Sequence, residues 1–518
     1  MIHFERLLSH CAERFGPRPA IVGKNRTTSY RELEEISLGG AVELRDRGVS
    51  PGQPVVLLAP NSISFLVGYF AIVMSGAVVA PLSPDATRAE LQAMLQATAP
   101  VAAIVVKTHH GRDYQIELAA FLPEHVLWIK SVDRPEWAAS DDRDAIVDRA
   151  PESPGLLAFT SGSTGRPKAA RHRSDTLIRS AHSALECVLD GRPVVSATTF
   201  PLHNMGGINS ALPVLLGGGQ VVIMDGFDVP TLIDLIENYR VEFILAIPAM
   251  IELLFLKGDV HRHDLSALSR VLLSGAPVSN SLCQRIVNEL GAQPYLAYGL
   301  TEVPGVWLMT TTETPVDEVG PFVGWPAAGF ELLVIDDGGR RLAPDEIGEV
   351  CVRTDYRLLE YEGEPELTAA TVDPDGWLHT GDLGSLRADG GLVIRGRKKD
   401  MYIRGGFNVY PGEVEETLVG HHQISQAAVH GVPDAVLGEK GFAWIVTEPG
   451  SDLAVKEIRD YATRLLSHFK IPDYVRIVDV LPLTPVGKID KVALLTQAIR
   501  EIGLASHPNH TDLSHRRR

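Results

Sequence analysis

A nine-residue segment rich in glycine and hydroxyl side chains is the strongest chemical signal in the sequence. It reads Thr-Ser-Gly-Ser-Thr-Gly-Arg-Pro-Lys over residues 160–168, directly after the apolar run 156–159. Glycines allow such a loop to curl until its backbone N–H groups converge on an anion, and the hydroxyls and the lysine add donors that suit a triphosphate. A flexible surface turn is the alternative interpretation. The residues predicted to bind phosphate are Thr160, Ser161, Gly162, Ser163, Thr164, Gly165 and Lys168.

Charged side chains in three other segments could complete a nucleotide site. Glu302 closes the motif Tyr-Gly-Leu-Thr-Glu, and a carboxylate together with phosphate oxygens suits Mg²⁺. Asp382 closes Thr-Gly-Asp, where its carboxylate could accept hydrogen bonds from two ribose hydroxyls. Lys488 lies in Leu-Thr-Pro-Val-Gly-Lys-Ile-Asp-Lys, and its ammonium could stabilise the charge that builds up when a carboxylate attacks a phosphate. Each alone would indicate only a solvated surface charge, so the prediction depends on their occurring together.

These motifs, in this order and over about residues 10–500, resemble the adenylate-forming superfamily of acyl-CoA synthetases, peptide-synthetase adenylation domains and firefly luciferase. The resemblance implies that Tyr298 stacks on adenine, that Thr301 contacts the α-phosphate and that Glu302 helps to hold Mg²⁺. It implies that Asp382 and Arg397 bind the ribose. The adenine pocket would also include Gly275, Ala276, Pro277 and Gly299.

The same resemblance implies a mobile C-terminal lid. Asp400 would be its hinge and Lys488 its catalytic lysine. The segment 402–411, Tyr-Ile-Arg-Gly-Gly-Phe-Asn-Val-Tyr-Pro, resembles the acyl-CoA synthetase branch more than the peptide-synthetase branch. In that branch Gly405 and Gly406 would swing beside a pantetheine tunnel, where missing side chains leave room for a thiol arm. An ordinary tight turn between strands is the alternative for these two glycines.

The acyl pocket is the part that the sequence defines least. Pro-Leu-His-Asn-Met-Gly-Gly, residues 201–207, corresponds to the segment that carries a histidine near the acid in the family. Aligned without a gap, Asn204 takes the histidine's place; with a shift of one residue, His203 takes it. Gly206 and Gly207 are compatible with a bulky apolar acid or with simple core packing. Because no aspartate near the predicted pocket could pair with an α-ammonium, we expect an apolar carboxylic acid rather than an amino acid.

The resemblance implies a two-step reaction. The carboxylate of the acid attacks the α-phosphate of Mg²⁺-ATP, which gives acyl-AMP and pyrophosphate. The lid then rotates, and coenzyme A takes the acyl group as a thioester. Two alternatives stay open: the acyl group passes to a carrier protein or partner enzyme, or the chain is a non-catalytic nucleotide-binding relative.

The elements that must position these residues follow an alternating pattern. Short apolar runs at 54–59, 101–106, 242–247 and 270–274 predict buried strands, with helical patterns such as 230–239 and 280–290 between them. The predicted class is α/β: a large N-terminal domain, residues 1–396, of two α/β subdomains plus a small β-rich subdomain at about 320–396. A hinge at 397–400, a small mobile α+β lid at 401–506 and a disordered tail at 507–518 would follow.

Composition limits the function classes. The chain has 518 residues and a formal net charge of -17, which argues against nucleic-acid binding. The four cysteines lack metal-type spacing, and no signal peptide or membrane span is expected, which predicts a cytoplasmic protein. The histidine pairs 109–110, 261/263 and 421–422 lack a third ligand at suitable spacing and are predicted to be solvated. The oligomeric state is left open.

Overall fold

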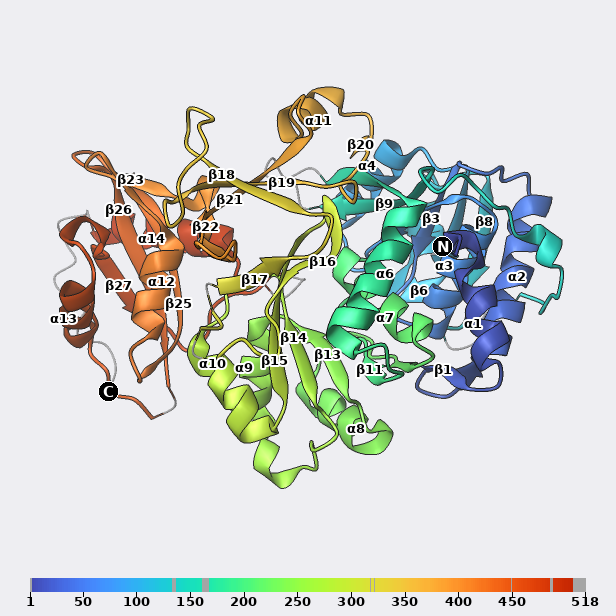
Figure 1. The fold of residues 1–518 in the computed structure, drawn as a ribbon, viewed down its shortest axis with the longest axis horizontal. Helices are drawn as coiled ribbons and strands as arrows, with labels where there is room; N and C mark the ends of the chain where they lie inside the picture. Colours follow the sequence, from blue (N-terminus) through green and yellow to red (C-terminus); the bar gives the residue numbers. More distant parts are fainter. Residues whose placement is uncertain are drawn as a thin grey trace.

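The computed structural model describes residues 2–132, 137–160, 167–316, 318–320, 322–448, 450–484 and 488–505. Two α/β layers form most of the molecule, and the C-terminal part lies at the opposite end from the N-terminus (Figure 1). The predicted α/β class, with a large N-terminal and a small C-terminal domain, is confirmed. The exact boundaries at residues 396 and 400 stay predictions. The predicted tail, residues 507–518, lies outside the described residues.

A seven-stranded sheet forms the first α/β unit, in the order β20-β10-β9-β4-β3-β5-β8. Its strands are β3 (Pro54–Leu58), β4 (Val78–Leu82), β5 (Ala102–Val106), β8 (His125–Ile129), β9 (Pro154–Thr160), β10 (Lys168–Arg173) and β20 (Glu360–Tyr361). Within the sheet the five neighbouring strands β9, β4, β3, β5 and β8 are parallel. At the edge, β10 pairs antiparallel with β9, and β20 pairs antiparallel with β10. The helices of this part of the chain are α1 (Leu7–Phe15), α2 (Tyr30–Asp46), α3 (Ile63–Met74), α4 (Arg88–Thr98), α5 (Tyr114–Glu117) and α6 (Ser174–Leu189). A two-stranded hairpin, β6 (Thr108–His109) with β7 (Arg112–Asp113), follows β5.

A thirteen-stranded sheet forms the second unit. One end of this sheet is antiparallel and continues beyond the unit as an arm. Its order is β18-β19-β21-β22-β17-β16-β15-β14-β13-β11-β12-β1-β2. The part from β15 to β1 is parallel: β1 (Pro19–Val22), β11 (Val195–Ala197), β12 (Gln220–Val222), β13 (Phe243–Ala246), β14 (Arg270–Leu273) and β15 (Gln293–Leu300), with β2 (Thr27–Ser29) antiparallel at the edge. The antiparallel arm contains β16 (Val303–Met309), β17 (Phe322–Pro326), β18 (Glu331–Ile335), β19 (Gly348–Arg353), β21 (Trp377–Leu386) and β22 (Leu392–Arg397). The helices are α7 (Met205–Leu216), α8 (Val229–Tyr239), α9 (Pro248–Lys257), α10 (Asn280–Arg285) and α11 (Pro365–Thr371).

The predicted elements mostly form where the pattern placed them, with one difference. The helix expected at 280–290 changes to a π-helical turn at Ile286–Leu290 after α10. In the β-rich part, β22 pairs with β21 as far as Arg397. Strand β22 therefore ends directly before the 3₁₀ turn Lys398–Asp400.

One hydrophobic core joins the two α/β units. It includes Leu57 on β3, Leu177 on α6, Leu212 on α7 and Leu245 on β13. Helices α6 and α7 thus pack between the sheets. Asn61, buried after β3, adds a polar link: its amide donates to the carbonyls of Phe200 and Met224, both at 3.0 Å, and its Oδ1 accepts from the Leu202 N–H at 2.7 Å. The carboxyl ends of β3, β11 and β12 are therefore held together.

The C-terminal part has its own sheet and its own cores. Its strands are β23 (Tyr402–Arg404), β24 (Phe407–Val409), β25 (Ile424–Asp434), β26 (Gly438–Thr447) and β27 (Tyr474–Ile477), and its helices are α12 (Pro411–Val419), α13 (Val455–Leu465) and α14 (Lys491–Ala505). Alternate residues of β25 face opposite sides: Val429 packs with α12 and α13, and Ala428 packs with α14. In the described part of the chain, no helix is long and apolar enough to cross a membrane.

Candidate functional site

The buried carboxylate of Asp382 is the centre of the candidate site. The residue is 3% exposed and lies on β21, directly opposite Arg397 on β22. The Arg397 Nε is 2.8 Å from Oδ1 of Asp382, and the Tyr298 hydroxyl donates a hydrogen bond to Oδ2. Thus three residues that the sequence assigned to one nucleoside come together from β15, β21 and β22.

Burial and charge act in opposite directions on this carboxylate. Burial raises the pKa of Asp382, whereas Arg397 and the hydrogen bond from Tyr298 lower it. The pKa of Tyr298 lies well above its usual value because its hydroxyl is buried beside the Asp382 charge. The tyrosine therefore stays a hydrogen-bond donor. The net shift of the Asp382 pKa is upward, and Arg397 opposes it by favouring the ionised carboxylate.

Aromatic packing fixes the ring of Tyr298. Trp307, fully buried on β16, meets it edge-on at 5.1 Å between ring centres and also stacks on Phe330. Gly299 follows as an exposed residue, so the backbone beside the tyrosine is open. The predicted stacking of Tyr298 on adenine stays a prediction, as does the contact of Thr301 with the α-phosphate. Thr301 lies in the turn between β15 and β16.

Glu302, in the same turn as Thr301, is held by a tyrosine that sequence reasoning missed. The Tyr361 hydroxyl donates to Oε1 of Glu302 at 2.6 Å, and the Leu358 N–H donates to the Glu302 carbonyl at 2.7 Å. Lys168 contacts the face of the same tyrosine, with Nζ 5.9 Å from the ring centre. Burial and the Glu302 charge raise the pKa of Tyr361, so its hydroxyl stays a donor. The tyrosine thus connects the residue predicted for Mg²⁺ to the lysine predicted for phosphate.

Part of the predicted phosphate loop lies outside the described residues: Ser161, Gly162, Ser163, Thr164 and Gly165, together with the side chain of Thr160. The flanking strands define where the loop begins and ends. Thr160 on β9 pairs with Lys168 on β10, so the loop connects two adjacent antiparallel strands.

Lys488 reaches this site from the C-terminal part. Its Cε lies 3.6 Å from where a Cβ on Gly275 would stand, in the turn after β14 that contains Ala276 and Pro277. Gly275 has a φ of +83°, a backbone conformation that favours glycine. Burial and the neighbouring positive charge of Arg397 lower the pKa of Lys488, and the charge of Asp382 opposes that shift. The lysine therefore lies in the electrostatic field of the same carboxylate that Tyr298 and Arg397 contact.

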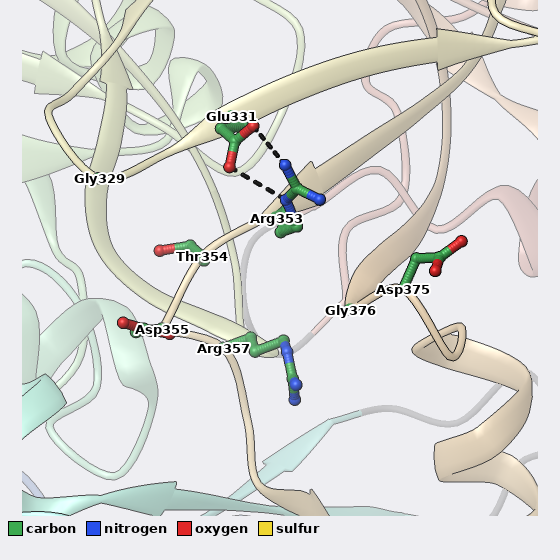
Figure 2. Close-up of a pocket in the computed structure, with 8 residues that line it drawn as sticks. All are labelled: Gly329, Glu331, Arg353, Thr354, Asp355, Arg357, Asp375 and Gly376. Atoms are coloured by element: carbon green, nitrogen blue, oxygen red, sulfur yellow. Dashed lines mark hydrogen bonds and ion pairs between the residues drawn. The ribbon is translucent and has the colours of Figure 1, made fainter.

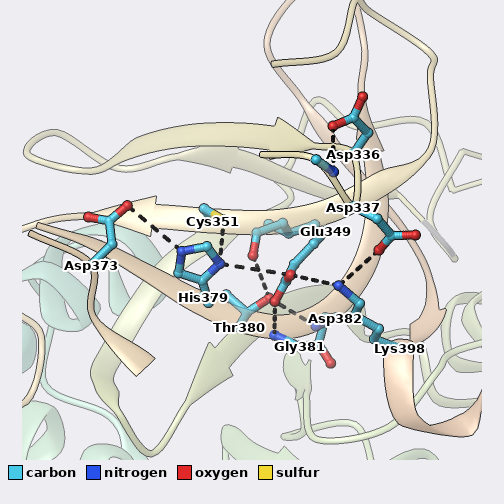
Figure 3. Close-up of polar contacts among 12 residues, drawn as sticks. Asp336, Asp337, Glu349, Cys351, Asp373, His379, Thr380, Gly381, Asp382 and Lys398 are labelled. Carbon is cyan, nitrogen blue, oxygen red and sulfur yellow. Dashed lines mark hydrogen bonds and ion pairs between the residues drawn. The ribbon is translucent and has the colours of Figure 1, made fainter. Parts of the chain in front are cut away.

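A second polar network holds the backbone of β21 beside Asp382 (Figure 3). Glu349 on β19 accepts from the Gly381 N–H and from Lys398 Nζ, both at 3.3 Å, and Lys398 also pairs with Asp337 at 3.0 Å. Cys351, near this network, is not an activated nucleophile because burial raises the pKa of its thiol to about 12. The network links the predicted ribose strand to Lys398, which precedes Asp400 in the predicted hinge.

Close packing explains the glycines of the predicted acyl segment. A Cβ on Gly207 would lie 2.1 Å from the Pro201 carbonyl oxygen, and one on Gly206 would lie 3.0 Å from the Phe200 ring. Asn204 precedes α7 without a side-chain capping bond. Burial lowers the pKa of His203 to about 4, so its imidazole is neutral at pH 7. Which of His203 and Asn204 takes the family's histidine position stays open.

The glycines predicted for the thiol tunnel form the hairpin turn between β23 and β24. Gly405 and Gly406 have φ values of +59° and +87°, a left-handed conformation that favours glycine. A Cβ on Gly406 would meet no atom within 4 Å. Hairpin geometry accounts for both glycines in this conformation, and their role in thiol transfer stays a prediction.

The cavity drawn in Figure 2 is separate from the predicted site. It has a volume of about 380 Å³ and lies at the surface of the antiparallel arm, beside the Arg353–Glu331 ion pair. Its lining residues are Gly329, Glu331, Arg353, Thr354, Asp355, Arg357, Asp375 and Gly376. None of them belongs to the predicted nucleotide site.

Known proteins match this chain over nearly its full length. The family described as AMP-binding enzyme matches residues 8–361, and the AMP-binding enzyme C-terminal domain matches residues 413–488. A 3-[(3aS,4S,7aS)-7a-methyl-1,5-dioxo-octahydro-1H-inden-4-yl]propanoyl:CoA ligase of Rhodococcus jostii (strain RHA1) is 32% identical, over 94% of this chain and 97% of its own. A fatty acid–[acyl-carrier-protein] ligase, ScoC, of Streptomyces coeruleorubidus is 31% identical, over 91% of this chain and 92% of its own. The crystal structure of ATP-bound MatB from Rhodopseudomonas palustris superposes with a TM-score of 0.85 at 25% identity and covers 96% of this chain and 99% of that one.

Replacing Arg397 should shift the pH dependence of ATP binding. Because Arg397 lowers the pKa of the buried Asp382, Arg397→Gln should let that carboxylate protonate at higher pH and lose its ability to accept from ribose hydroxyls. The pH below which ATP affinity falls, measured by calorimetry, should therefore be higher in this variant than in the wild type. The control is Arg395→Gln, which also removes a positive charge from β22. Because Arg395 pairs with Glu416 and not with Asp382, this variant should leave the pH dependence of ATP affinity unchanged. Equal shifts in both variants would contradict the assignment.

Removing the Tyr361 hydroxyl should weaken binding of the magnesium complex of ATP specifically. A hydrogen bond to a charged group contributes about 1.5–3 kcal/mol, so Tyr361→Phe should raise the Kd of Mg²⁺-ATP about tenfold or more. The Kd of metal-free ATP should change little. Tyr356→Phe, a neighbouring tyrosine that packs on Phe330, is the matched control. A loss that is the same with and without Mg²⁺ would show that the tyrosine supports the fold rather than Glu302.

Proposed function

The chain belongs to the AMP-binding enzyme family, and on this basis we propose that it is an ATP-dependent acid–thiol ligase. It activates an apolar carboxylic acid as acyl-AMP with release of pyrophosphate, and then transfers the acyl group to coenzyme A. The observation that carries the proposal is the position of Lys488 beside Gly275 and within reach of the Asp382 charge. A protein that only binds a nucleotide needs no cation from a second domain at that point.

Charge compensation is the main task of the first half-reaction. A carboxylate and an α-phosphate are both negative, so their approach requires a cation at the point where charge builds up. The Lys488 ammonium interacts electrostatically with Asp382 and Arg397, so it lies close to the proposed nucleotide contacts. In this proposal Lys488 contacts the reacting oxygens, and Thr301 contacts the α-phosphate from the turn between β15 and β16. Lys168 contacts the phosphates that leave as pyrophosphate.

The other residues of the site orient the nucleotide. The Asp382 carboxylate accepts from the ribose hydroxyls, Arg397 favours its ionised form and adds a donor, and Tyr298 covers the adenine. Glu302 is a hard oxygen ligand fixed by Tyr361, which fits a magnesium ion held through the phosphates of ATP. Bound there, Mg²⁺ would neutralise phosphate charge.

A rotation of the lid would separate the two half-reactions. Lys488 lies at the nucleotide site with the C-terminal part placed as it is here, and in this proposal adenylation is the step that needs it. Rotation about Asp400 would withdraw the lysine and bring the Gly405–Gly406 turn to the thiol entrance. The turn is exposed and open around Gly406, which is compatible with that movement. One active-site face could then serve two reactions.

The acid is proposed to be apolar, aliphatic or cyclic, and larger than propionate. The relatives act on acids of this kind by name: an indenyl propanoyl acid, ferulic and coumaric acids, and fatty acids. Burial of apolar surface at about 25 cal/mol per Å² would supply the binding energy. The name of the ScoC relative favours one alternative, transfer to an acyl carrier protein rather than to free coenzyme A.

Replacing Lys488 should separate the two half-reactions. Lys488→Ala should slow adenylation by about 10²–10³ or more, measured as acid-dependent ATP–pyrophosphate exchange. Thioester formation from supplied acyl-AMP should stay largely intact, because the lysine acts only in the first step. Lys399→Ala removes an exposed positive charge that also acts on Lys488 and should have a small effect. Equal losses in both half-reactions would contradict the role of Lys488.

Matched pairs of acids should identify both the substrate class and the acceptor. Each apolar acid should release pyrophosphate faster than its α-amino analogue, because burying an ammonium without a partner costs several kcal/mol. Mass analysis of the products with free coenzyme A should then show an acyl-CoA. Faster turnover of the amino acids would place the chain with the peptide synthetases. Acyl-AMP that reacts with a carrier protein but not with coenzyme A would support the alternative acceptor.

A further inference from the structure

Two histidines and an aspartate form a cluster outside the nucleotide site. His109 is the last residue of β6 and His110 begins the turn to β7, whereas Asp85 lies in the loop after β4. Oδ1 of Asp85 is 3.7 Å from His109 Nε2 and 3.4 Å from His110 Nδ1, and all three ligand atoms lie within 4.8 Å of one another. The two imidazole rings lie 3.8 Å apart between centres. Three potential ligands therefore face one point in space.

The cluster lies where the two α/β units meet. Strands β4, β5 and β12 are parallel strands, and the loops after their carboxyl ends carry Asp85, the histidine pair and Asp225. Loops at this edge are the usual position of ligand sites in α/β sheets. The charge of Asp85 also acts on the buried His203, so the cluster lies near the predicted acyl segment. Asp225 interacts electrostatically with both histidines and with Asp85.

The surrounding contacts hold the ligands in position. Arg112, on the return strand of the hairpin, donates to the carbonyls of Pro84 at 2.9 Å and Ala86 at 2.7 Å, one on each side of Asp85. The Tyr114 hydroxyl donates to the same Pro84 carbonyl. His110 itself has a φ of +46°, which few non-glycine residues adopt. The hairpin that carries the histidines thus fixes the loop that carries the aspartate.

We propose that Asp85, His109 and His110 bind a divalent transition-metal cation of the zinc class. Bonds of about 2.0–2.1 Å in a tetrahedron place neighbouring ligand atoms about 3.3–3.4 Å apart. The two distances from Asp85, 3.7 Å and 3.4 Å, are already close to that value, and the two histidine nitrogens, which lie within 4.8 Å, would move together by up to about 1.4 Å when an ion binds. Two imidazoles and one carboxylate suit Zn²⁺, Co²⁺ or Ni²⁺ far better than Mg²⁺. The fourth position is left for water or for Asp225. A bound ion would cross-link the loops after β4 and β5 beside His203.

The other histidine pairs of the described chain lack this arrangement. His421 and His422 stack at 4.8 Å between ring centres, but His421 packs on Tyr461 rather than on a carboxylate. His261 and His263 approach different carboxylates, Glu289 and Glu237. The sequence predicted that all of these pairs are solvated. The His109–His110 pair differs from this expectation. The side chain of His109 is only 8% exposed, and Asp85, 24 residues upstream, supplies a third potential ligand.

Titration of the untagged, chelator-stripped chain with Co²⁺ tests the site directly. The wild-type chain should bind one equivalent with visible absorption typical of tetrahedral Co²⁺, and Zn²⁺ but not Mg²⁺ should displace it. Asp85→Asn and His110→Ala alter exposed side chains, so they should keep the fold while raising the Kd about 100-fold or more. His422→Ala is the matched control and should bind as the wild type does.

Two results would overturn the proposal. One is the absence of a stoichiometric Co²⁺ complex in the wild-type chain. The other is an equal effect of His110→Ala and His422→Ala, which would show that the metal binds surface histidines without preference. Neither result depends on ligase activity, so the proposed function and the metal site succeed or fail separately.

Discussion

The buried carboxylate of Asp382 is the interaction on which the arrangement of the site depends. It is contacted by Tyr298 from β15 and by Arg397 from β22, so the end of the parallel sheet and the antiparallel arm meet at one charge. A buried carboxylate is costly without partners, and these two supply them. Since Lys488 also lies in the field of this carboxylate, the C-terminal part is positioned with respect to the same point.

The predicted hinge segment, residues 397–400, contains both a proposed ribose contact and the proposed pivot of the lid. Arg397 is the last residue of β22, and the 3₁₀ turn Lys398–Asp400 follows at once. A movement about Asp400 would therefore begin one turn away from the proposed ribose contact. Lys398 adds a link in the present conformation, because it pairs with Asp337 and Glu349 on the antiparallel arm. The Lys398–Asp337 pair is exposed to water and contributes little stability, so it can break when the lid moves.

The sequence alone predicts the parts that depend on local patterns. Apolar runs located buried strands such as β3, β5, β13 and β14. The motif residues Tyr298, Asp382 and Arg397, assigned from separate segments, meet in the structure. The residues that were missed act through contacts distant in sequence: Tyr361 reaches Glu302 across 59 positions, and Asn61 reaches Leu202 across 141. No spacing rule reveals such pairs. The glycines of the acyl segment were ambiguous for a related reason, since only the backbone geometry shows how close Gly207 lies to Pro201.

The central claim is that the acid's own carboxylate attacks the α-phosphate, and oxygen labelling tests it most directly. An acid labelled with ¹⁸O in its carboxyl group is incubated with ATP, Mg²⁺, coenzyme A and the enzyme, and the nucleotide product is analysed by mass spectrometry. Attack on the α-phosphate places one labelled oxygen in AMP, because the thiol later attacks the carbonyl carbon and leaves the bridging oxygen on phosphorus. Unlabelled AMP, or label found in inorganic phosphate together with ADP, would contradict the account.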